Sequence, residues 1–353
     1  MAVLRPAGDF DESYQHDMAT LRQPWQWVVL IVFIAALYAL PFYASQTVVA
    51  LANRALIAII TVQGLNLLTG YTGQISLGQA AFMTVGGYVS TLLVGELGWP
   101  FLAALPVAAL AAGVIGLLFG LPSLRVKGFY LVMATLAAQL IIPWFTRNAF
   151  PDLLNGTQGL NAPVPVIAGI AFDGPQKYLY LSLSLVIVTT VAAHNLSRSR
   201  PGRAFVAIRD NDVAAELLGV NVFAYKLRAF FLASVFAGLA GVLQAHYLRH
   251  INSETFTLVD SILYLGMLVV GGLGTNLGPI FGAIVITLLV ETATVIGPFL
   301  FDFFPNAPAG ATASIRPLFF GVSLMLFLIF EPRGLAHRWQ LIKAGWRLRP
   351  FAR

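Results

Sequence analysis

Residues 101–121 read FLAALPVAALAAGVIGLLFGL, an apolar run without a charged side chain. A helix needs about 20 such residues to cross the roughly 30 Å hydrocarbon core of a bilayer. Similar runs recur along the chain, so we expect an all-α integral membrane protein with about ten transmembrane helices. The runs are residues 25–41, 48–69, 76–95, 101–121, 128–146, 178–195, 227–247, 258–275, 279–297 and 315–331.

The composition agrees with a membrane protein. Hydrophobic residues make up 58% of the 353 positions and charged residues only 10%, whereas ordinary soluble domains contain about 25% charged residues. The strands of a membrane β-barrel would show shorter segments of alternating hydrophobicity, so the long runs favour helices. The chain has no cysteine, which excludes disulfides, thiolate nucleophiles and cysteine metal sites.

The basic residues predict which loops face the cytoplasm. If the amino terminus lies inside, the inside segments hold 16 of the 21 Lys and Arg, with two in the amino-terminal tail, two at 122–127, six at 196–228 and six in the carboxy-terminal tail. This positive-inside asymmetry explains the net charge of +6 without nucleic acid. We therefore expect a cytoplasmic tail at 1–24, a transmembrane domain at 25–331 and a basic cytoplasmic tail at 332–353.

One inside segment, residues 197–226, is amphipathic. Pro201 and Gly202 break the chain after the sixth apolar run, residues 203–218 then have helical spacing, and Gly219 follows as a C-cap glycine would. Such a helix could lie flat at the cytoplasmic surface where a partner grips it, or it could simply be an interfacial helix anchored by basic residues. The residues expected on its apolar side are Phe205, Ile208, Ala215 and Leu218.

The longest predicted outer loop, residues 146–177, contains FPDLLNGTQGLNAPVPV and is rich in Gly, Pro and Asn. Long loops without periodicity are uncommon unless they are functional. The loop is therefore a candidate surface for a partner at the outer face, and a simple connector is the alternative.

Polar residues and glycines interrupt the apolar runs between Gly64 and Gly87. Irregular backbone is not tolerated against lipid, but it is tolerated where it lines a cavity or is buried in protein. The segment therefore suits a polar path across the membrane, although close helix packing through small residues explains the glycines equally well.

Glu291 is the only acidic residue well inside a predicted span. A carboxylate at membrane depth is costly and is a functional candidate by default. It could meet the amino group of a zwitterionic substrate, pair with a polar group such as Gln139, or merely reach toward the outer interface, because Gly297 and Pro298 follow closely. The candidate pathway residues are Asn66, Gln74, Ser76, Gln79, Gln139 and Glu291.

Five ordered motifs resemble those of the branched-chain amino acid ABC importer permeases, and the M-type rather than the H-type member of the pair. The resemblance extends over about residues 50 to 335 and implies a type II-like ABC importer permease. The motifs are GLNLLTGYTGQISLGQAAFMTVGGYVSTLL from Gly64, LRVKGFYLVMATLA from Leu124, GRAFVAIRDNDVAAELLGVNVFAYKLRAFFLASVFAGLAGVLQA from Gly202, VGGLGTNLGPIFGAI from Val270 and FEPRGL from Phe330.

By this resemblance, residues 203–219 are the coupling helix that docks on a separate ATP-binding subunit. The importer pattern is Glu-Ala-Ala, three residues, then Gly, and here Val213 occupies the Glu position while Asp212 lies one place early. That departure puts in doubt any salt bridge assigned to the Glu, but not the docking role. The expected ATPase-coupling residues are Arg203, Arg209, Asp210, Asp212, Ala214, Ala215, Glu216 and Gly219.

The resemblance also implies partners. It implies a heterodimer with a related H-type permease, two ATP-binding subunits, an external solute-binding protein and a location in the bacterial inner membrane. The sequence contains no G-x-x-x-x-G-K-[ST] motif, so we expect this chain to be no enzyme and to bind no cofactor, with ATP and Mg²⁺ handled by the partner subunits. We also expect no metal site, because only His246 and His250 have ligand-like spacing.

Three alternatives remain at this point. A urea importer would have a closely similar permease, so the substrate class is open between hydrophobic amino acids and urea or amides. An ion-coupled secondary transporter would need paired intramembrane charges or clear repeats. A membrane enzyme is suggested only by Asn211, Asp212 and Glu216, which are loosely similar to the magnesium-binding loops of membrane prenyltransferases but lack a second acidic cluster.

Overall fold

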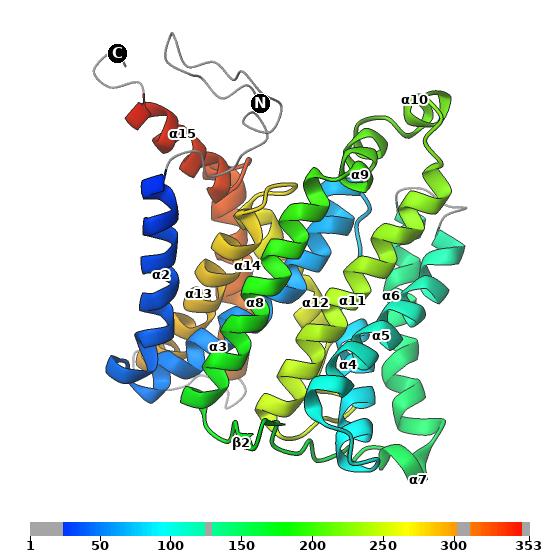
Figure 1. Cartoon of the computed structure of the whole chain (residues 1–353), viewed down its shortest axis with the longest axis vertical. Coiled ribbons are helices and arrows are strands. Elements are labelled where there is room, and N and C mark those ends of the chain that lie inside the picture. Colours follow the sequence, from blue (N-terminus) through cyan, green and yellow to red (C-terminus); the bar gives the residue numbers. More distant parts are fainter. Residues whose placement is uncertain (1–23, 124–128, 302–310, 348–353) are drawn as a thin grey trace.

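The computed structural model describes residues 24–123, 129–301 and 311–347, and these form long helices with one short β-hairpin (Figure 1). The predicted tail at 1–24 therefore lies almost wholly outside the described residues. The predicted tail at 332–353 lies partly outside them, because its last residues are not described. The elements are α2 (Pro24–Tyr43), α3 (Gln46–Leu65), η1 (Asn66–Tyr71), α4 (Gln79–Gly95), α5 (Phe101–Ser123), α6 (Phe129–Asn148), α7 (Pro151–Leu154), β1 (Val166–Ile167), β2 (Ile170–Ala171), α8 (Pro175–Arg198), α9 (Arg200–Asp210), α10 (Asp212–Leu217), α11 (Val222–Leu248), α12 (Leu258–Gly271), α13 (Gly278–Phe301), α14 (Ala311–Phe330) and α15 (Leu335–Arg347).

Each predicted span coincides with helical structure, although the second comprises α3 and η1 and the eighth is the 14-residue helix α12, so the all-α membrane fold is confirmed. Among the described residues, six helices are long and apolar enough to cross a membrane, and a seventh span results if the bent pair α14 and α15 is counted as one. The third predicted span begins later than expected. Its helix α4 starts at Gln79 rather than at residue 76, because the chain between η1 and Gln79 is irregular.

Helix α11 lies at the centre of the fold and packs against α3, α4 and α5. The backbones approach closely here. A Cβ added to Gly241 would lie 2.0 Å from the carbonyl oxygen of Met83, and one added to Gly86 would lie 2.4 Å from that of Gly238. Within a membrane the hydrophobic effect contributes little to helix association. Small residues let the helices approach closely and gain van der Waals contact instead. Close packing therefore explains Gly86, the glycine near the end of the predicted polar segment.

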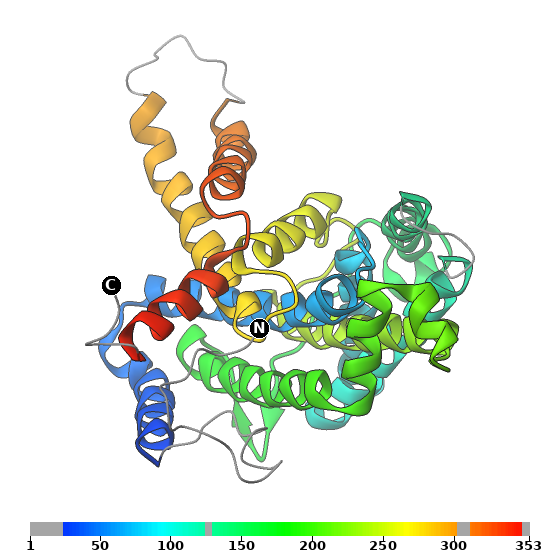
Figure 2. The same cartoon turned by 90° about the horizontal axis from the view of Figure 1, so that it is seen from above.

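The two ends of the helix bundle carry different segments (Figure 1). The start of α2, the pair α9 and α10, and α15 all lie at one end, whereas α7 and the β-hairpin lie at the opposite end. Seen from above, α13 and α14 project as a pair from the remaining helices (Figure 2). Of the segments predicted to be cytoplasmic, residues 197–226 and the described part of the tail at 332–353 thus share one end, and the loop 146–177 occupies the other.

Candidate functional site

The chain changes direction at η1, a π-helix that continues α3, and at the irregular residues that follow it. Thr69 donates a hydrogen bond to the carbonyl oxygen of Gln74 at 2.9 Å, and the amide of Gln74 donates to the hydroxyl of Thr72 at 2.9 Å. Ser76 accepts from the backbone N–H of Gly78 at 3.3 Å. Buried backbone needs such partners. In this structure Gln74 and Ser76 are buried, and the hydrogen bonds named here lie within the irregular segment itself.

The start of α4 is buried and is capped by side chains from other helices. Gln139 on α6 accepts from the backbone N–H of Ala81 at 2.8 Å and from the hydroxyl of Ser261 at 3.1 Å. The amide of Gln79 donates to the carbonyl oxygen of Thr61 at 3.0 Å. The bond from Ala81 satisfies a helix donor that has no partner within the helix. The suggested pairing of Gln139 with Glu291 is therefore wrong, because Gln139 is bound to the α4 terminus.

Asn66, the first residue of η1, ties this π-helix to the loop between α12 and α13. Its side-chain oxygen accepts from the backbone N–H of Gly274 at 2.9 Å, and its amide donates to the carbonyl oxygen of Thr275 at 2.9 Å. At the other end of η1, the hydroxyl of Tyr71 donates to Asn276 at 2.7 Å. A Cβ on Gly274 would lie 2.9 Å from the carbonyl oxygen of Gly70. η1 and the loop between α12 and α13 therefore touch each other directly at these two glycines.

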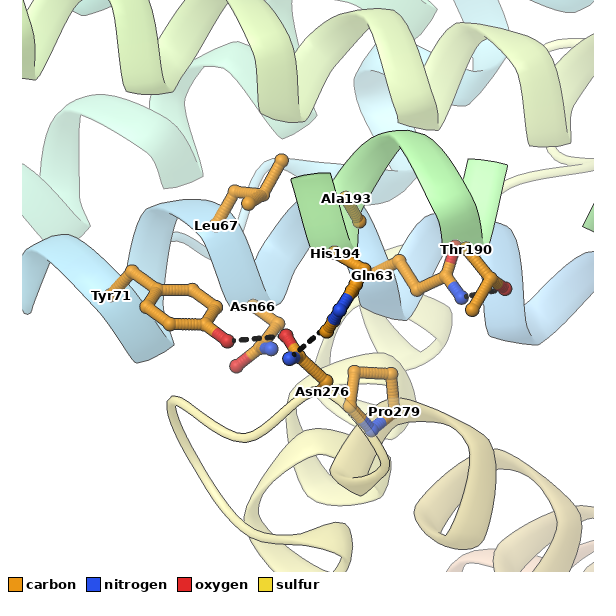
Figure 3. A pocket seen from close by; sticks show the side chains of 9 residues that line it. All are labelled: Gln63, Asn66, Leu67, Tyr71, Thr190, Ala193, His194, Asn276 and Pro279. Carbon is orange, nitrogen blue, oxygen red and sulfur yellow. Dashed lines mark hydrogen bonds between the residues drawn. The ribbon is translucent and has the colours of Figure 1, made fainter. Parts of the chain in front are cut away.

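A polar pocket opens beside this contact, between η1, the last turns of α8 and the start of α13 (Figure 3). The side chain of Asn276 lies at its centre and meets His194 Nδ1 at 2.8 Å as well as Tyr71. Gln63 donates to Thr190 at 2.6 Å along the pocket wall. The lining residues are Gln63, Asn66, Leu67, Tyr71, Thr190, Ala193, His194, Asn276 and Pro279. Of these residues, only Asn66 was predicted as a pathway residue. The lining comes from several elements, and only the fold brings them together.

The inside segment is two helices rather than the single helix predicted for residues 203–219. Asn211 adopts an extended backbone, and its side chain accepts from the N–H groups of Val213 and Ala214 to cap α10. Asn residues are favoured as N-caps, so Asn211 starts a new helix. Gly219 has φ of +85°, the left-handed conformation expected of a glycine after a helix.

The break at Asn211 changes which of the predicted apolar residues pack against the bundle. Phe205, Ile208 and Ala215 are buried, whereas Leu218 is 84% exposed, because the turn redirects the second helix. Leu217 is 85% exposed beside it. The tip of α10 therefore presents adjacent apolar side chains, a feature that the consecutive leucines of the sequence could have indicated.

The predicted coupling residues occupy this segment in different ways. Asp212 forms an ion pair with Lys226 of α11 at 3.3 Å, and Asp210 pairs with its neighbour Arg209 at 3.2 Å. Arg203 donates to the carbonyl oxygen of Arg198 at 3.1 Å. Ala215 is buried, whereas Ala214 and Glu216 are exposed at the tip.

The side chain of one predicted coupling residue, Arg209, contacts residues outside this segment. Arg209 Nη1 donates to the carbonyl oxygen of Gly70 in η1 at 3.0 Å, and a Cβ on Gly274 would lie 2.7 Å from the same nitrogen. Hydrogen bonds from a charged donor are among the stronger ones. Arg209 thus connects α9 to η1 and also contacts the loop that Asn66 holds.

The loop 146–177 is anchored at the opposite end of the bundle. Leu160 pairs with Ile251 in a β-bridge, and Arg249 donates to the carbonyl oxygen of Asp173. Lys177 meets the Asp173 carboxylate at 2.9 Å, and this hydrogen bond, together with one from the backbone, lowers the pKa of that carboxyl. The loop is therefore tied to the end of α11, and its carboxylate stays ionised at neutral pH.

Glu291 on α13 faces Arg54 on α3, with Oε2 and Nη1 3.6 Å apart. Arg54 was not among the residues predicted for the pathway, because nothing in its own segment indicates a carboxylate partner on another helix. Only the packing of α3 against α13 brings the two charges together.

Comparisons with known proteins give a consistent result. A family model described as branched-chain amino acid transport system / permease component matches residues 47–329. The high-affinity branched-chain amino acid transport system permease protein LivM of Escherichia coli K12 is 30% identical over 90% of this chain and 76% of its own length. The probable LivM of Methanocaldococcus jannaschii is 24% identical over 66% of this chain and 67% of its own. PsaBC from Streptococcus pneumoniae in complex with Fab covers 88% of this chain and 99% of its own, with 17% identity and a TM-score of 0.41.

Proposed function

The chain belongs to the family of branched-chain amino acid transport system permease components, and from that premise we propose that it forms part of the translocation path of an ATP-driven importer. We propose branched-chain or related hydrophobic amino acids as its substrates. A permease component of this family is not itself catalytic. We therefore propose that ATP and Mg²⁺ bind to separate subunits, and we assign no cofactor to this chain.

The observation that carries the coupling role is the hydrogen bond between Arg209 and the carbonyl oxygen of Gly70. The exposed tip of α10, with Leu217 and Leu218, is the surface we assign to the ATP-binding subunit. Because Arg209 connects α9 to η1, a displacement of the tip would be transmitted to the π-helix. π-helical segments are frequently functional, since their hydrogen bonds are already irregular.

We propose the remaining partners and the orientation as well. The anchored loop 146–177 is proposed to receive an external solute-binding protein, and a related H-type permease would complete the path. The shared end of the start of α2, the α9–α10 segment and α15 supports cytoplasmic termini in a bacterial inner membrane (Figure 1). The excess of Lys and Arg in the segments at that end agrees with this orientation.

The test is uptake by the complete importer in proteoliposomes, with its two permeases, ATP-binding subunits and solute-binding protein. We expect ATP-dependent uptake of leucine, isoleucine and valine. Uptake of urea with no uptake of leucine would overturn the substrate class. Uptake that follows an ion gradient without ATP would overturn the importer itself and favour a secondary transporter.

A further inference from the structure

Arg54 and Glu291 form an open pair of opposite charges within helices that are long and apolar enough to cross a membrane. Arg54 lies about 12 Å along α3 from its first residue, and Glu291 about 20 Å along α13, at 1.5 Å per residue. Neither charge is therefore at the first turn of its helix. Ionisable groups at such depth are rare, and they face a water-filled path or another group rather than lipid.

The pair is not a closed salt bridge. Arg54 Nη1 and Glu291 Oε2 are 3.6 Å apart, beyond hydrogen-bond distance, and the side chain of Arg54 is 60% exposed against 31% for that of Glu291. A guanidinium has five N–H donors, and those of Arg54 have no hydrogen bond to the residues that the structure describes. The arginine therefore retains donors for an external carboxylate.

Apolar side chains flank the acidic member of the pair. Ile284, Leu288 and Val295 lie seven and three residues before and four residues after Glu291, so they share its face of α13. All three are exposed, at 39%, 49% and 70%. Helix α13 projects with α14 from the other helices (Figure 2).

We propose that Arg54 and Glu291 bind the α-carboxylate and the α-ammonium group of a zwitterionic amino acid as it crosses the membrane. This assignment rests on the proposed import function and names the charged contacts of the path. A carboxylate would take the free N–H donors of Arg54, and an ammonium group would donate to Glu291. The flanking apolar residues would contact an uncharged side chain, so amino acids with a charged side chain would be excluded.

The test uses the reconstituted importer with Arg54→Gln, Glu291→Gln and the double variant. We expect each single change to lower leucine uptake per ATP hydrolysed by about tenfold or more, the effect of losing one charged hydrogen bond. The double variant separates a substrate role from a structural one. Removing both partners of a structural ion pair is nearly neutral, whereas a substrate site needs both charges, so the double variant should remain at least as defective as either single variant.

The ion pair of Arg338 and Glu331, which joins the end of α14 to α15, supplies the matched control. Replacing both of these residues with Gln should leave uptake unchanged. Assembly of the complex and ATPase stimulation by the solute-binding protein are measured in every variant, so that misfolding is recognised separately. Recovered uptake in the Arg54 and Glu291 double variant, or unchanged uptake in both single variants, would overturn the proposal. If the wild-type importer takes up no amino acid, the proposed function fails instead.

Discussion

Replacing Arg209 with Gln tests how movement at α10 reaches the membrane helices. The substitution removes the charged donor that bonds the carbonyl oxygen of Gly70 at 3.0 Å. It leaves Asn211, which caps α10, and the exposed leucine tip in place. The permease should therefore still bind its ATP-binding subunits, whereas the connection to η1 and the ion pair with the neighbouring Asp210 are lost.

The expected size of the effect follows from the free energy of the hydrogen bond between Arg209 and Gly70. A hydrogen bond from a charged group contributes about 1.5–3 kcal/mol. The side chain of Arg209 is 38% exposed, so solvent reduces the value toward the lower limit. About 1.5 kcal/mol corresponds to roughly a tenfold change. We therefore expect Arg209→Gln to lower the number of substrate molecules transported per ATP by about tenfold.

The assay is leucine uptake measured together with ATP hydrolysis in proteoliposomes. Arg338→Gln is the matched control, because Arg338 lies on α15 at the same end of the bundle and its bond goes to Glu331 rather than to η1. Copurification of the ATP-binding subunits shows whether docking is retained. If Arg209→Gln transports as many molecules per ATP as the wild type, the coupling role of this contact is refuted.

Three further changes test other contacts. Asn66→Ala leaves a backbone N–H and a carbonyl of the α12–α13 loop without their partner. It should lower the melting temperature of the complex, because an unsatisfied buried group costs about 1–3 kcal/mol. An unchanged melting temperature would contradict this. Gly241→Ala forces a Cβ against the facing backbone of α4 and should abolish folded permease in the membrane, as seen by size-exclusion chromatography, whereas Gly321→Ala has open space and should be tolerated. Leu217→Ser with Leu218→Ser should reduce copurification of the ATP-binding subunits without changing permease stability, because both side chains are exposed; normal copurification would exclude docking at the tip of α10.

The polar residues in the apolar runs could be predicted from the sequence only in part. Asn66, Gln79 and Gln139 were recognisable as polar groups in apolar runs, and the structure brings each of them to a backbone partner on another element. The partners themselves were not recognisable. Any buried polar group needs a partner, but which of many backbone groups supplies it depends on how the helices pack.

The inside segment shows a local limit of the same kind. Helical spacing predicted one continuous helix from residue 203 to residue 218, and the cap at Asn211 divides it. Asn is favoured both at caps and in turns, so its presence alone does not decide between a continued helix and a new one. The burial of Phe205 against the exposure of Leu218 follows from that break.

The sequence by itself determined the helical membrane fold, because a helix that crosses a bilayer must be apolar over a fixed length and must satisfy its own backbone. It also determined the family, through motifs that lie in order along the chain. The tertiary structure alone decided that Arg209 meets Gly70 and that Arg54 faces Glu291. Those contacts join residues far apart in the chain, and their distances depend on helix packing rather than on any local pattern.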